Sequence, residues 1–469
     1  MNRRDFLKTS AFGFSTLFFR KRKDKPNVLF IAIDDLNDWT GCLGGHPDTL
    51  TPNIDNLAKK GVLFTNAHCA APLCNPSRAA LMTGIRPNTS GVYYNDQPWR
   101  KSPILKNAIT IPQHFRKNGY KVIGSGKIFH GQYPDPISWD EYWPSKIMQK
   151  PKDPMPQGRP LNGIPNTKHF DWGPVDVNID QMGDMKVAKW VIRQLNKKHE
   201  KPVFLGCGFF RPHLPWYVPP KYFKRFPLDR IHLPEVKEDD LDDIPPIGIR
   251  FAKPWKDHKK VIKYKQWKKA VQAYLASINF MDECLGKVIN ALEKREDKDK
   301  WVVVLWADHG WHLGEKLHWR KFTLWEEATR NILVFIAPGI TKKGGRCIEP
   351  VSLIDIYPTL IDLCDLTSNK KLEGKSLLPQ LKDPAKEREE PALTTYGKGN
   401  HSLRSKHWRY IRYHDGTEEL YDHRKDPMEW TNLASKKKFL EIKEKFRTYL
   451  PEIDAPPSPR KKKKRRRKV

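Results

Sequence analysis

The stretch NVLFIAIDD, residues 27–35, decides how this chain is expected to fold. After Asn27 it is a continuous apolar run to Ile33, as expected of a strand that is covered on both faces of a parallel sheet. Two carboxylates, Asp34 and Asp35, follow at once. In open α/β sheets, binding sites lie beyond the carboxyl ends of the strands. The stretch therefore predicts an α/β fold with a site at the end of this strand.

A second stretch far along the chain repeats the pattern. Residues 301–306, WVVVLW, lead through Ala307 into Asp308 and His309. One such acidic ending is often a turn or a helix cap. Two of them favour a metal site if the strands end at the same edge of the sheet, although the order of the strands cannot be read from the sequence.

The chain between these strands alternates between helical and extended patterns. Helices are expected over 53–60, 111–118 and 270–292, and the first two are followed by Gly61 and Gly119, as helix ends prefer. Short strands are expected over 62–64 and 120–124. The segments 131–175 and 211–260 are rich in Pro, Trp and charge and show little periodicity, so we expect long loops that shape a substrate site.

The sequence pattern changes in the C-terminal part of the chain. WRYIRY (408–413) and TEELYD (417–422) flank Asp415-Gly416, a pair that suits a tight turn between paired strands. The expected organisation is an export signal and basic linker (1–25), a catalytic domain (26–390), a C-terminal subdomain (391–453) and a basic disordered tail (454–469).

The chain is strongly basic. Its 469 residues carry a formal net charge of +31, with a pI near 9.7, which points to polyanionic partners: nucleic acid, acidic membrane, or sulfated or carboxylated polysaccharide. Nine consecutive cations, 460–468, account for less than a third of that charge, and such a block is most often a solvated tail. No aromatic-basic RNA motif and no recognition helix are visible, so no nucleic acid partner is expected.

The N-terminus reads as a targeting segment. In MNRRDFLKTSAFGFSTLFF, Arg3 and Arg4 precede Phe6 and Leu7, followed by a weakly apolar stretch. This is typical of a twin-arginine export signal, the alternative being a basic disordered start. No A-x-A cleavage site is present, so we expect a periplasmic or extracellular protein and leave cleavage of the signal open. No later run of eighteen apolar residues occurs, so no internal membrane span is expected.

The seven cysteines show no C-x-x-C pair and no zinc spacing. Cys74 differs from the others, because LCNPSRAALMTG (73–84) places a proline and an arginine at fixed offsets from it, which a structural cysteine does not need. The other six are either free and buried or partly bridged.

Cys74 in C-x-P-S-R, followed by AALMTG, resembles the signature of the type I sulfatases of the alkaline phosphatase-like superfamily, whose cysteine is oxidised to formylglycine (3-oxoalanine). The resemblance covers nearly the whole folded chain, through NVLFIAIDDLNDW, TPNIDNLAKKGVLFTNAHC, GKIFH, RPHLPW, ADHGWHLGE and ELYDHRKDPMEW. Within the family it is strongest to the iduronate-2-sulfatases and their bacterial relatives. It implies a large, mixed, mostly parallel sheet sandwiched by helices, with a smaller C-terminal α+β domain that contains an antiparallel sheet.

The resemblance also implies the chemistry. A formylglycine-generating maturation enzyme reads Cys74, Pro76 and Arg78 and converts the thiol to an aldehyde. In the hydrated aldehyde one hydroxyl attacks sulfur and the second later expels sulfate, whereas a serine would leave a stable sulfate ester on the enzyme.

The family's metal site maps onto the two strand ends. Asp34, Asp35, Asp308 and the modified Cys74 offer hard oxygen ligands, as Ca²⁺ prefers, with Mg²⁺ as the alternative. His309 occupies the fourth protein position, although imidazole is an unusual ligand for a hard cation and a histidine in this place is often only a hydrogen-bonding neighbour.

Five cationic or titratable residues are implied to act on the sulfate. Arg78 resembles the residue that holds the diol, Lys127 the one that grips sulfate, and His130 the one that takes a proton. Lys127 and His130 are three residues apart, so on one helical turn they would face the same way. His213 resembles a second sulfate-binding residue that protonates the leaving alcohol, with Lys321 beside it. Outside a family motif, a lone lysine or histidine of this kind is usually a surface residue.

The expected substrate is a polyanionic sulfated saccharide, with 2-O-sulfated uronate favoured. Tryptophans in the long loops would stack on sugar rings or, alternatively, pack the loops onto the core: Trp139, Trp143, Trp172 and Trp216. One departure from the family is Lys316, where many relatives carry histidine, which puts the local substrate contacts in doubt; His318 compensates or has no role. Two other functions stay open: a phosphate or phosphonate ester hydrolase of the same superfamily, and a non-catalytic polyanion-binding protein.

Overall fold

The structure, a computed structural model, describes residues 25–167 and 169–461. The predicted export signal, up to residue 24, and the final residues 462–469 of the predicted tail lie outside the described residues. The strands are β1 (Asn27–Asp34), β2 (Val62–His68), β3 (Lys121–Gly126), β4 (Glu141–Trp143), β5 (Trp172–Pro174), β6 (Val203–Pro212), β7 (Trp216–Val218), β8 (Trp301–Ala307), β9 (His312–Leu313), β10 (Trp319–Arg320), β11 (Arg330–Ile336), β12 (Gly345–Cys347), β13 (Val351–Ser352), β14 (Ala392–Thr395), β15 (His401–Arg404), β16 (Trp408–Arg412) and β17 (Glu418–Asp422). The α-helices are α1 (Pro52–Lys60), α2 (Cys74–Thr83), α3 (Pro87–Ser90), α4 (Ile111–Lys117), α5 (Gly183–Leu195), α6 (Pro220–Phe223), α7 (Pro246–Ala252), α8 (Asp257–Lys263), α9 (Trp267–Glu293), α10 (Glu326–Thr329), α11 (Ile356–Leu363), α12 (Leu378–Lys382) and α13 (Leu440–Arg447).

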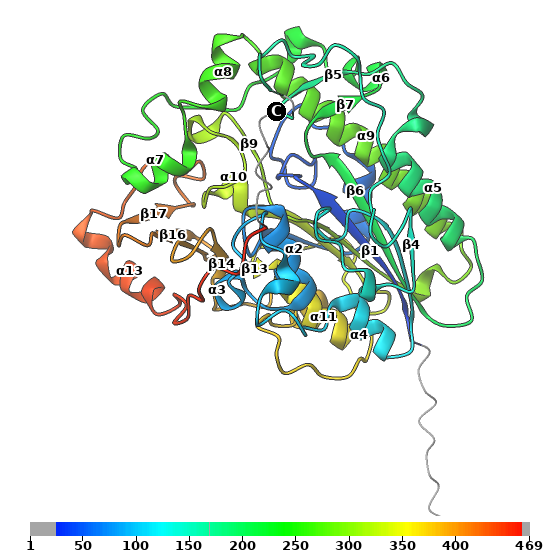
Figure 1. Cartoon of the computed structure of the whole chain (residues 1–469). Helices are drawn as coiled ribbons and strands as arrows, with labels where there is room; N and C mark the ends of the chain where they lie inside the picture. Colours follow the sequence, from blue (N-terminus) through cyan, green and yellow to red (C-terminus); the bar gives the residue numbers. More distant parts are fainter. Residues whose placement is uncertain (1–24, 168, 462–469) are drawn as a thin grey trace, which may run out of the picture.

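A nine-stranded mixed sheet forms the centre of the described chain, in the order β12-β2-β11-β8-β1-β6-β3-β4 with β13 also paired to β2 (Figure 1). Strand β11 runs antiparallel to β2 and β8, whereas the other pairs are parallel. The predicted large, mixed, mostly parallel sheet is confirmed.

The order of the strands brings the two acidic endings together. β1 lies directly beside β8, in parallel, with Ile33 opposite Ala307. Asp34 and Asp308 therefore leave neighbouring strands at the same edge of the sheet.

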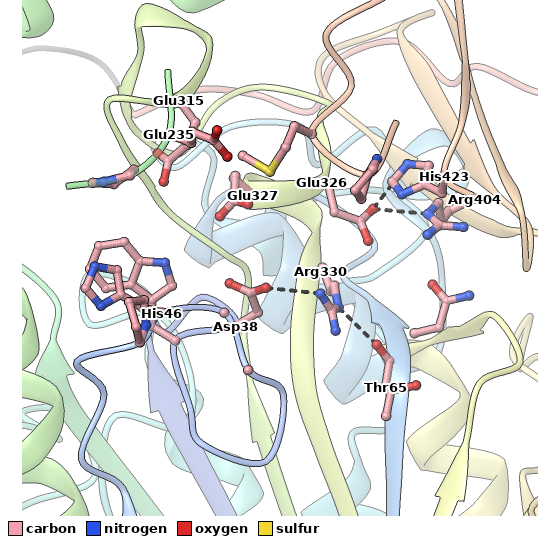
Figure 2. A pocket seen from close by; sticks show the side chains of 18 of the residues that line it. Asp38, His46, Thr65, Glu235, Glu315, Glu326, Glu327, Arg330, Arg404 and His423 are labelled. Atoms are coloured by element: carbon pink, nitrogen blue, oxygen red, sulfur yellow. Dashed lines mark hydrogen bonds and ion pairs between the residues drawn. The ribbon is translucent and has the colours of Figure 1, made fainter. Parts of the chain in front are cut away.

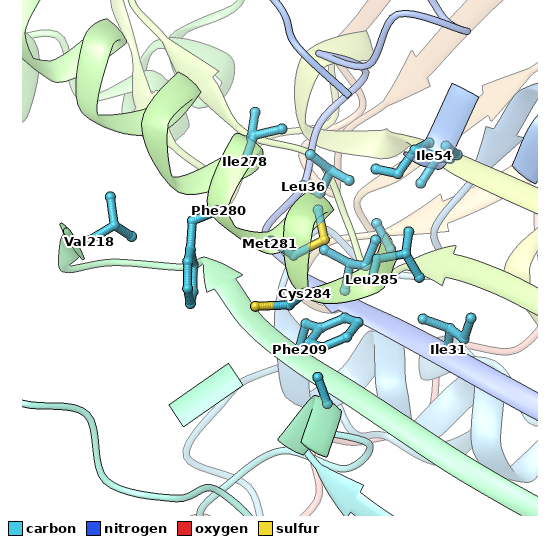
Figure 3. Packing of buried hydrophobic residues seen from close by; sticks show 14 of the residues in the cluster. Ile31, Leu36, Ile54, Phe209, Val218, Ile278, Phe280, Met281, Cys284 and Leu285 are labelled. Atoms are coloured by element: carbon cyan, nitrogen blue, oxygen red, sulfur yellow. The ribbon is translucent and has the colours of Figure 1, made fainter. Parts of the chain in front are cut away.

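Both faces of the sheet are covered, which explains why β1 is apolar at successive positions. Leu29, Ile31 and Ile33 belong to one apolar cluster, with α5 and α9, while the intervening residues of β1 belong to another, with α2, α4 and α11. Figure 3 shows the first of these faces, where Met281 and Leu285 of α9 lie over the sheet. A strand that is buried on both faces has no polar alternation, as expected from the sequence.

A second, four-stranded antiparallel sheet follows in the order β14-β15-β16-β17. The predicted hairpin joins β16 to β17. Gly416 occupies the turn with a φ of 91°, in the left-handed region that favours glycine. The predicted hairpin and the antiparallel sheet are therefore confirmed.

The long segments are only partly loops. Residues 131–175 contain β4 and β5 as their strands, but residues 211–260, expected to be irregular, contain β7 and the short helices α6, α7 and α8. That expectation was wrong, because these helices are too short to show a period, and α6 and α7 begin at prolines, which the first helical turn tolerates.

Three of the four tryptophans considered for sugar stacking pack the loops onto the core. Trp139, Trp172 and Trp216 are 1%, 3% and 0% exposed. Trp143 is half-buried and packs against the same core. Of the two alternatives, core packing therefore holds for the three buried residues, since no face of their indoles is open to a ligand.

Residues 454–461, assigned to the disordered tail from the sequence, pack on the segment after α3. The N–H groups of Ala455, Ser458 and Lys461 donate to the carbonyls of Asn88, Gly91 and Asp96 at 2.7, 2.7 and 2.8 Å. These residues therefore form an ordered strap on the catalytic part.

The seven cysteines are all free, and every one except the half-buried Cys42 is buried. Among the described residues, none of the helices combines the length and the apolarity that a membrane crossing requires.

Candidate active site

Three buried carboxylates converge at the edge where β1 and β8 end. Asp34 is the last residue of β1, and Asp35 follows with a φ of 60°, a left-handed conformation that is costly for a residue other than glycine. The N–H of Asp35 donates to Oδ1 of Asp308 at 3.0 Å. All three side chains are 0% exposed. The strained turn thus gathers three acidic groups in one buried place.

Arg78, on α2, clamps this group. Its Nε donates to Oδ2 of Asp308 at 2.8 Å and its Nη2 to Oδ1 of Asp34 at 3.1 Å. Its Nη1 donates to the carbonyl of Ile128 at 2.9 Å. The guanidinium therefore joins the ends of β1 and β8 to the segment after β3.

Cys74 is the first residue of α2 and is 1% exposed. Its Sγ lies 2.9 Å from Nζ of Lys321, 3.7 Å from Nζ of Lys127 and 3.3 Å from Nε2 of His309. Burial raises the pKa of the Cys74 thiol, which stays protonated at neutral pH. The unmodified thiol is therefore a poor nucleophile, although two lysines and a histidine surround it.

Two ammonium groups flank Cys74. Lys127 Nζ donates to Oδ2 of Asp34, and Lys321 Nζ donates to Oδ1 of Asp35 at 2.6 Å. Burial would lower the pKa of each lysine, but the nearby carboxylates raise both. Both lysines therefore remain charged and are fixed beside Cys74, as needed to bind an anion there.

The two adjacent carboxyls have different proton affinities. Burial would raise the pKa of Asp34, but Lys127, His213 and Arg78 hold it well below its usual range. Burial raises the pKa of Asp35 to about 7, opposed by Lys321. Neighbouring acids whose pKa values are pushed apart are typical of a catalytic site.

The three predicted histidines lie around the same group and are neutral at pH 7. Burial lowers the pKa of His309 to about 4, and burial lowers the pKa values of His130 and His213 still further from their usual range. Nδ1 of His213 lies 2.6 Å from the carbonyl of Leu214 and that of His309 3.0 Å from the carbonyl of Gly310. A carbonyl only accepts, so Nδ1 carries the proton in both rings and each Nε2 presents a lone pair.

Those Nε2 atoms face Asp35. Nε2 of His213 is 3.7 Å from Oδ2 of Asp35, and Nε2 of His309 is 3.3 Å from Oδ1. His130 is different, because its buried Nδ1 has no hydrogen-bond partner among the described residues.

The prediction that Lys127 and His130 share a helical turn is wrong. Residues 127–130 form a bend after β3. The N–H of Lys127 donates to the carbonyl of Gly208 at 2.9 Å, so the backbone stays tied to β6 and does not enter a helix. The pKa of His130 is lowered first by burial and then by the charge of Lys127.

The residues present fit a hard divalent cation. Within 4.8 Å of one another lie two overlapping sets of donor atoms, from Asp34, Asp35, Cys74 and His213 and from Asp35, Cys74, Asp308 and His309. Oδ2 of Asp35, which is buried, has no hydrogen-bond partner in the described part of the chain. A buried carboxylate oxygen without a partner among three carboxylates is the donor chemistry that Ca²⁺ or Mg²⁺ requires.

Several residues around the site were missed from the sequence. The His169 ring lies 5.3 Å from that of His213, between centroids. Nζ of Lys150 and Nζ of Lys127 lie 3.1 and 5.3 Å from the centre of the Phe210 ring. His169 and Lys150 come from the irregular segment 131–175, where no period or motif marks them, whereas Phe210 immediately precedes a recognisable motif.

Lys316 does not belong to the site, so the doubt that it raised about substrate contacts was misplaced. It is 2% exposed, and its Nζ donates to Oδ1 of Asp240 at 2.7 Å and to the carbonyl of Glu429. His318, 5% exposed, lies 2.7 Å through Nε2 from the carbonyl of Lys321. It therefore contacts the backbone of a predicted site residue and does not replace Lys316.

A hollow of about 700 Å³ lies at a different place (Figure 2). Asp38 pairs with Arg330 there at 3.0 Å, and Glu326 contacts Arg404 and His423. Its lining includes none of the predicted site residues. The predicted residues thus form a small, charged and almost closed centre of their own.

Comparisons with known proteins agree with this geometry. Residues 26–366 match the family model described as Sulfatase, and residues 314–455 match that described as N-sulphoglucosamine sulphohydrolase, C-terminal. A protein of Formosa agariphila named Sulfatase is 40% identical over 93% of this chain and 88% of its own. Iduronate 2-sulfatase of Homo sapiens is 30% identical over 73% of this chain and 70% of its own. A solved structure in complex with its substrate D-glucosamine-2-N,6-O-disulfate has a TM-score of 0.74 at 20% identity, covering 91% of this chain and 97% of that chain, and so shares the fold.

Proposed function

The chain belongs to the sulfatase family and is a sulfuric ester hydrolase, and on that premise we propose that it cleaves sulfate esters of a polyanionic carbohydrate after Cys74 is converted to formylglycine. One observation carries the proposal: Cys74 Sγ lies between the ammonium groups of Lys321 and Lys127 and beside the three strand-end carboxylates. An anionic group placed on this atom would meet two fixed cations.

A divalent cation, Ca²⁺ or alternatively Mg²⁺, would be held by Asp34, Asp35, Asp308 and the modified Cys74, with Nε2 of His309 completing the set. The cation would neutralise sulfate oxygens, and the formylglycine hydrate would supply the attacking hydroxyl.

The cationic side chains of the protein bind and orient the sulfate. Lys127 is anchored by Asp34 and Lys321 by Asp35, so both ammonium groups are fixed before substrate arrives. Arg78 keeps the carboxylates in place by bonding Asp34 and Asp308. Donors that are already oriented stabilise developing charge without reorganisation.

The histidines move protons. His213 has its Nδ1 proton engaged by the carbonyl of Leu214, so Nε2 is free to accept the proton that the attacking hydroxyl loses and to pass it to the leaving alcohol. His130, neutral because of burial, accepts the proton of the second hydroxyl when that hydroxyl expels sulfate. The site is buried, so bulk water does not compete for these transfers.

The substrate class rests on charge and on the relatives. The chain carries +31, and one relative is named Iduronate 2-sulfatase while one structural neighbour was solved with D-glucosamine-2-N,6-O-disulfate. We therefore favour a 2-O-sulfated uronate within a polyanionic saccharide. A screen of defined sulfated mono- and disaccharides, read by released sulfate, tests this choice. Turnover of aryl sulfates or choline sulfate without turnover of any sugar would overturn it.

The chemistry is tested at Cys74. Protein made together with a formylglycine-generating enzyme should show formylglycine in peptides that span residues 74–78 by mass spectrometry, and Cys74→Ser should lose turnover by several orders of magnitude because serine cannot release sulfate. Aryl phosphate and phosphonate serve as comparison substrates. Unmodified thiol despite the maturation enzyme, or faster cleavage of the phosphorus esters, would contradict the proposal.

We also propose that the protein is exported, because Arg3 and Arg4 precede Phe6 and Leu7 in a short, weakly apolar N-terminus. Replacing both arginines with lysine should keep the enzyme in the cytoplasm. Unchanged appearance in the periplasm or medium would refute the twin-arginine route.

A further inference from the structure

We propose that a small pocket beside the active site binds a second anionic group, a carboxylate or sulfate, on the sugar next to the one that loses its sulfate. The inference rests on the proposed function. The pocket has a volume of about 270 Å³ and lies between the end of α7 and residues 318–322; its lining includes Phe251, Lys253, Lys256, His318, Arg320 and Phe322.

The charge of the pocket is positive. Lys253 and Lys256 make no ion pair with any of the described residues, whereas Arg320 is paired with Asp257 at 2.6 Å. Burial, and then the charge of Lys256, lower the pKa of Lys253, and the opposing charge of Asp257 does not offset them. Asp257 also lines the pocket, but it is paired with Arg320, so the charges of Lys253 and Lys256 are in excess there. These two cations repel each other, and a bound anion would reduce that repulsion.

The backbone around the pocket is strained at several positions. Lys253, Arg320 and Phe322 have φ values of 52°, 81° and 82°, in the left-handed region that residues other than glycine seldom adopt. Such conformations concentrate at binding and catalytic sites. Arg320 and Phe322 are the two neighbours of Lys321. Their unusual backbone conformations let Lys321 point to Cys74 while Arg320 and Phe322 line the pocket.

Contacts place the pocket on the side of the leaving alcohol. The guanidinium of Arg320 lies 4.5 Å from the centre of the Phe170 ring. The residue before Phe170, His169, contacts the ring of His213. His213 is the residue to which we assign protonation of the leaving alcohol. The part of the substrate that remains after sulfate departs therefore extends toward Arg320 and the pocket.

The occupant fits a charged sugar. Lys253 and Lys256 supply the charges, and Phe251 and Phe322 supply aromatic surface of the kind on which sugars pack. Phe251 also lines a second hollow of about 890 Å³ that includes Tyr396 and Lys398. The surface therefore continues beyond the pocket, as a saccharide longer than two units requires.

The test compares two substrates with two variants. The substrates are a disaccharide with a 2-O-sulfated uronate and the same disaccharide with a second sulfate on the neighbouring sugar. The variant is Lys253→Gln with Lys256→Gln. Its matched control is Lys259→Gln with Lys260→Gln, which removes two exposed cations of α8 that do not line the pocket. The double variant should raise KM for the disulfated substrate about tenfold, as expected for lost contacts to a charged group, with kcat unchanged and the monosulfated substrate unaffected.

A second readout separates this inference from the proposed function. Calorimetric binding of the disulfated disaccharide, measured in a Cys74→Ser background that does not turn it over, should weaken about tenfold in the pocket variant and stay unchanged in the control. Absence of sulfate release by the wild type would refute the proposed function, and the binding measurement alone would then decide the pocket. Equal losses on both substrates, or none, together with unchanged binding, would overturn the pocket.

Discussion

Two buried groups of charges in this molecule look alike in composition and differ in how they are satisfied. The catalytic cluster consists of Asp34, Asp35, Asp308, Arg78, Lys127 and Lys321. The junction cluster, between the two sheets, consists of Glu326, Glu429, Arg404, Arg409 and His423. Glu326, His423 and Glu429 lie close enough to hold a metal ion, and the carboxylates of the catalytic cluster do so together with Cys74, His213 and His309.

The junction cluster is internally complete. Arg409 bonds both Glu326 and Glu429, and its Nη1 also donates to the carbonyl of Leu324 at 3.1 Å. None of its described side-chain polar atoms is buried without a partner. In the catalytic cluster, by contrast, Oδ2 of Asp35 has no partner among the residues described.

The pKa values follow this difference. Burial would raise the pKa of both Glu326 and Glu429, but the surrounding arginines and His423 hold both below their usual range. Asp35 instead has a pKa raised to about 7, first by burial. Fully paired charges thus stabilise the junction between the sheets. In the catalytic cluster the carboxylates are not fully paired, which suits the proposed binding of a cation and transfer of a proton.

Lys321→Met gives the largest expected effect. It removes an ammonium from beside Cys74, so kcat/KM should fall about a thousandfold, the loss typical of one preorganised donor. The free energy of unfolding should change by under about 2 kcal/mol, because Asp35 takes a proton when its counter-ion is gone.

Lys316→Met is the matched control, since it removes another buried lysine five residues away in the chain. That ammonium serves Asp240 and Glu429, so stability should fall while kcat of the folded enzyme is retained. Steady-state kinetics with urea denaturation separates the two outcomes. A variant of Lys321 that keeps its turnover would remove the distinction between the clusters.

Arg409→Met should have the next largest effect, on stability. It removes a cation that helps to hold the pKa values of both Glu326 and Glu429 low, and it leaves Glu429 with His423 and Glu326 with Arg404 and His423 as their cationic partners. Removing one partner of a buried ion pair costs about 3–5 kcal/mol. Chemical denaturation should show this loss, and kcat per folded molecule should be unchanged. A stable variant with low kcat would assign the junction cluster to catalysis.

The contrast between the clusters also shows what the sequence could predict. Asp34, Asp35 and Asp308 were found because each follows an apolar strand, and a buried strand is a local pattern. Their proximity additionally required the order of the strands, which depends on contacts between residues more than 270 positions apart, as in the bond from Asp35 to Asp308.

Residues on irregular segments could not be placed in this way. Lys316 stands inside a recognisable motif, yet its partners Asp240 and Glu429 come from segments whose path no local pattern specifies. His169 was missed for the same reason. For the tryptophans the sequence left sugar stacking and core packing open, because composition indicates aromatic surface but does not say what that surface covers. The sequence thus predicted the strand ends and the motif residues, and packing between loops decided the rest.

Calcium should act on the catalytic cluster and not on the junction cluster, and its expected effect on stability is somewhat smaller than that of Arg409→Met. A cation that binds the native state stabilises it by about 2.7 kcal/mol at one hundred times its Kd. We expect a rise in Tm when calcium is added to chelator-treated enzyme. Asp35→Asn should abolish this rise, whereas Glu429→Gln should preserve it, because the junction donors are already engaged by Arg409. A calcium response that depends on Glu429 instead of Asp35 would reverse the assignment.

The smallest effect concerns an ion network closer to the surface, at Glu418. Burial would raise the pKa of Glu418, but the hydrogen bonds from Tyr410, Arg447 and Lys443 lower it to about 2. Because the folded-state pKa is depressed, its contribution to stability is present above the ordinary pKa of 4.5 and is lost as the pH falls toward 2. The side chain of Arg447 is 34% exposed, so solvent screens the network and the contribution is about 1 kcal/mol or less.

The measurement is the difference in free energy of unfolding between wild type and Glu418→Gln, followed by urea denaturation from pH 7 downward. The difference should be constant above about pH 5 and shrink below it, because protonated Glu418 and glutamine are equally uncharged. Glu441→Gln, at an exposed position of α13, is the control and should show no such change. If the difference in free energy of unfolding stays the same at low pH, Glu418 contributes by packing and not by charge. The comparison between this partly exposed network and the buried junction cluster would then no longer rest on charge.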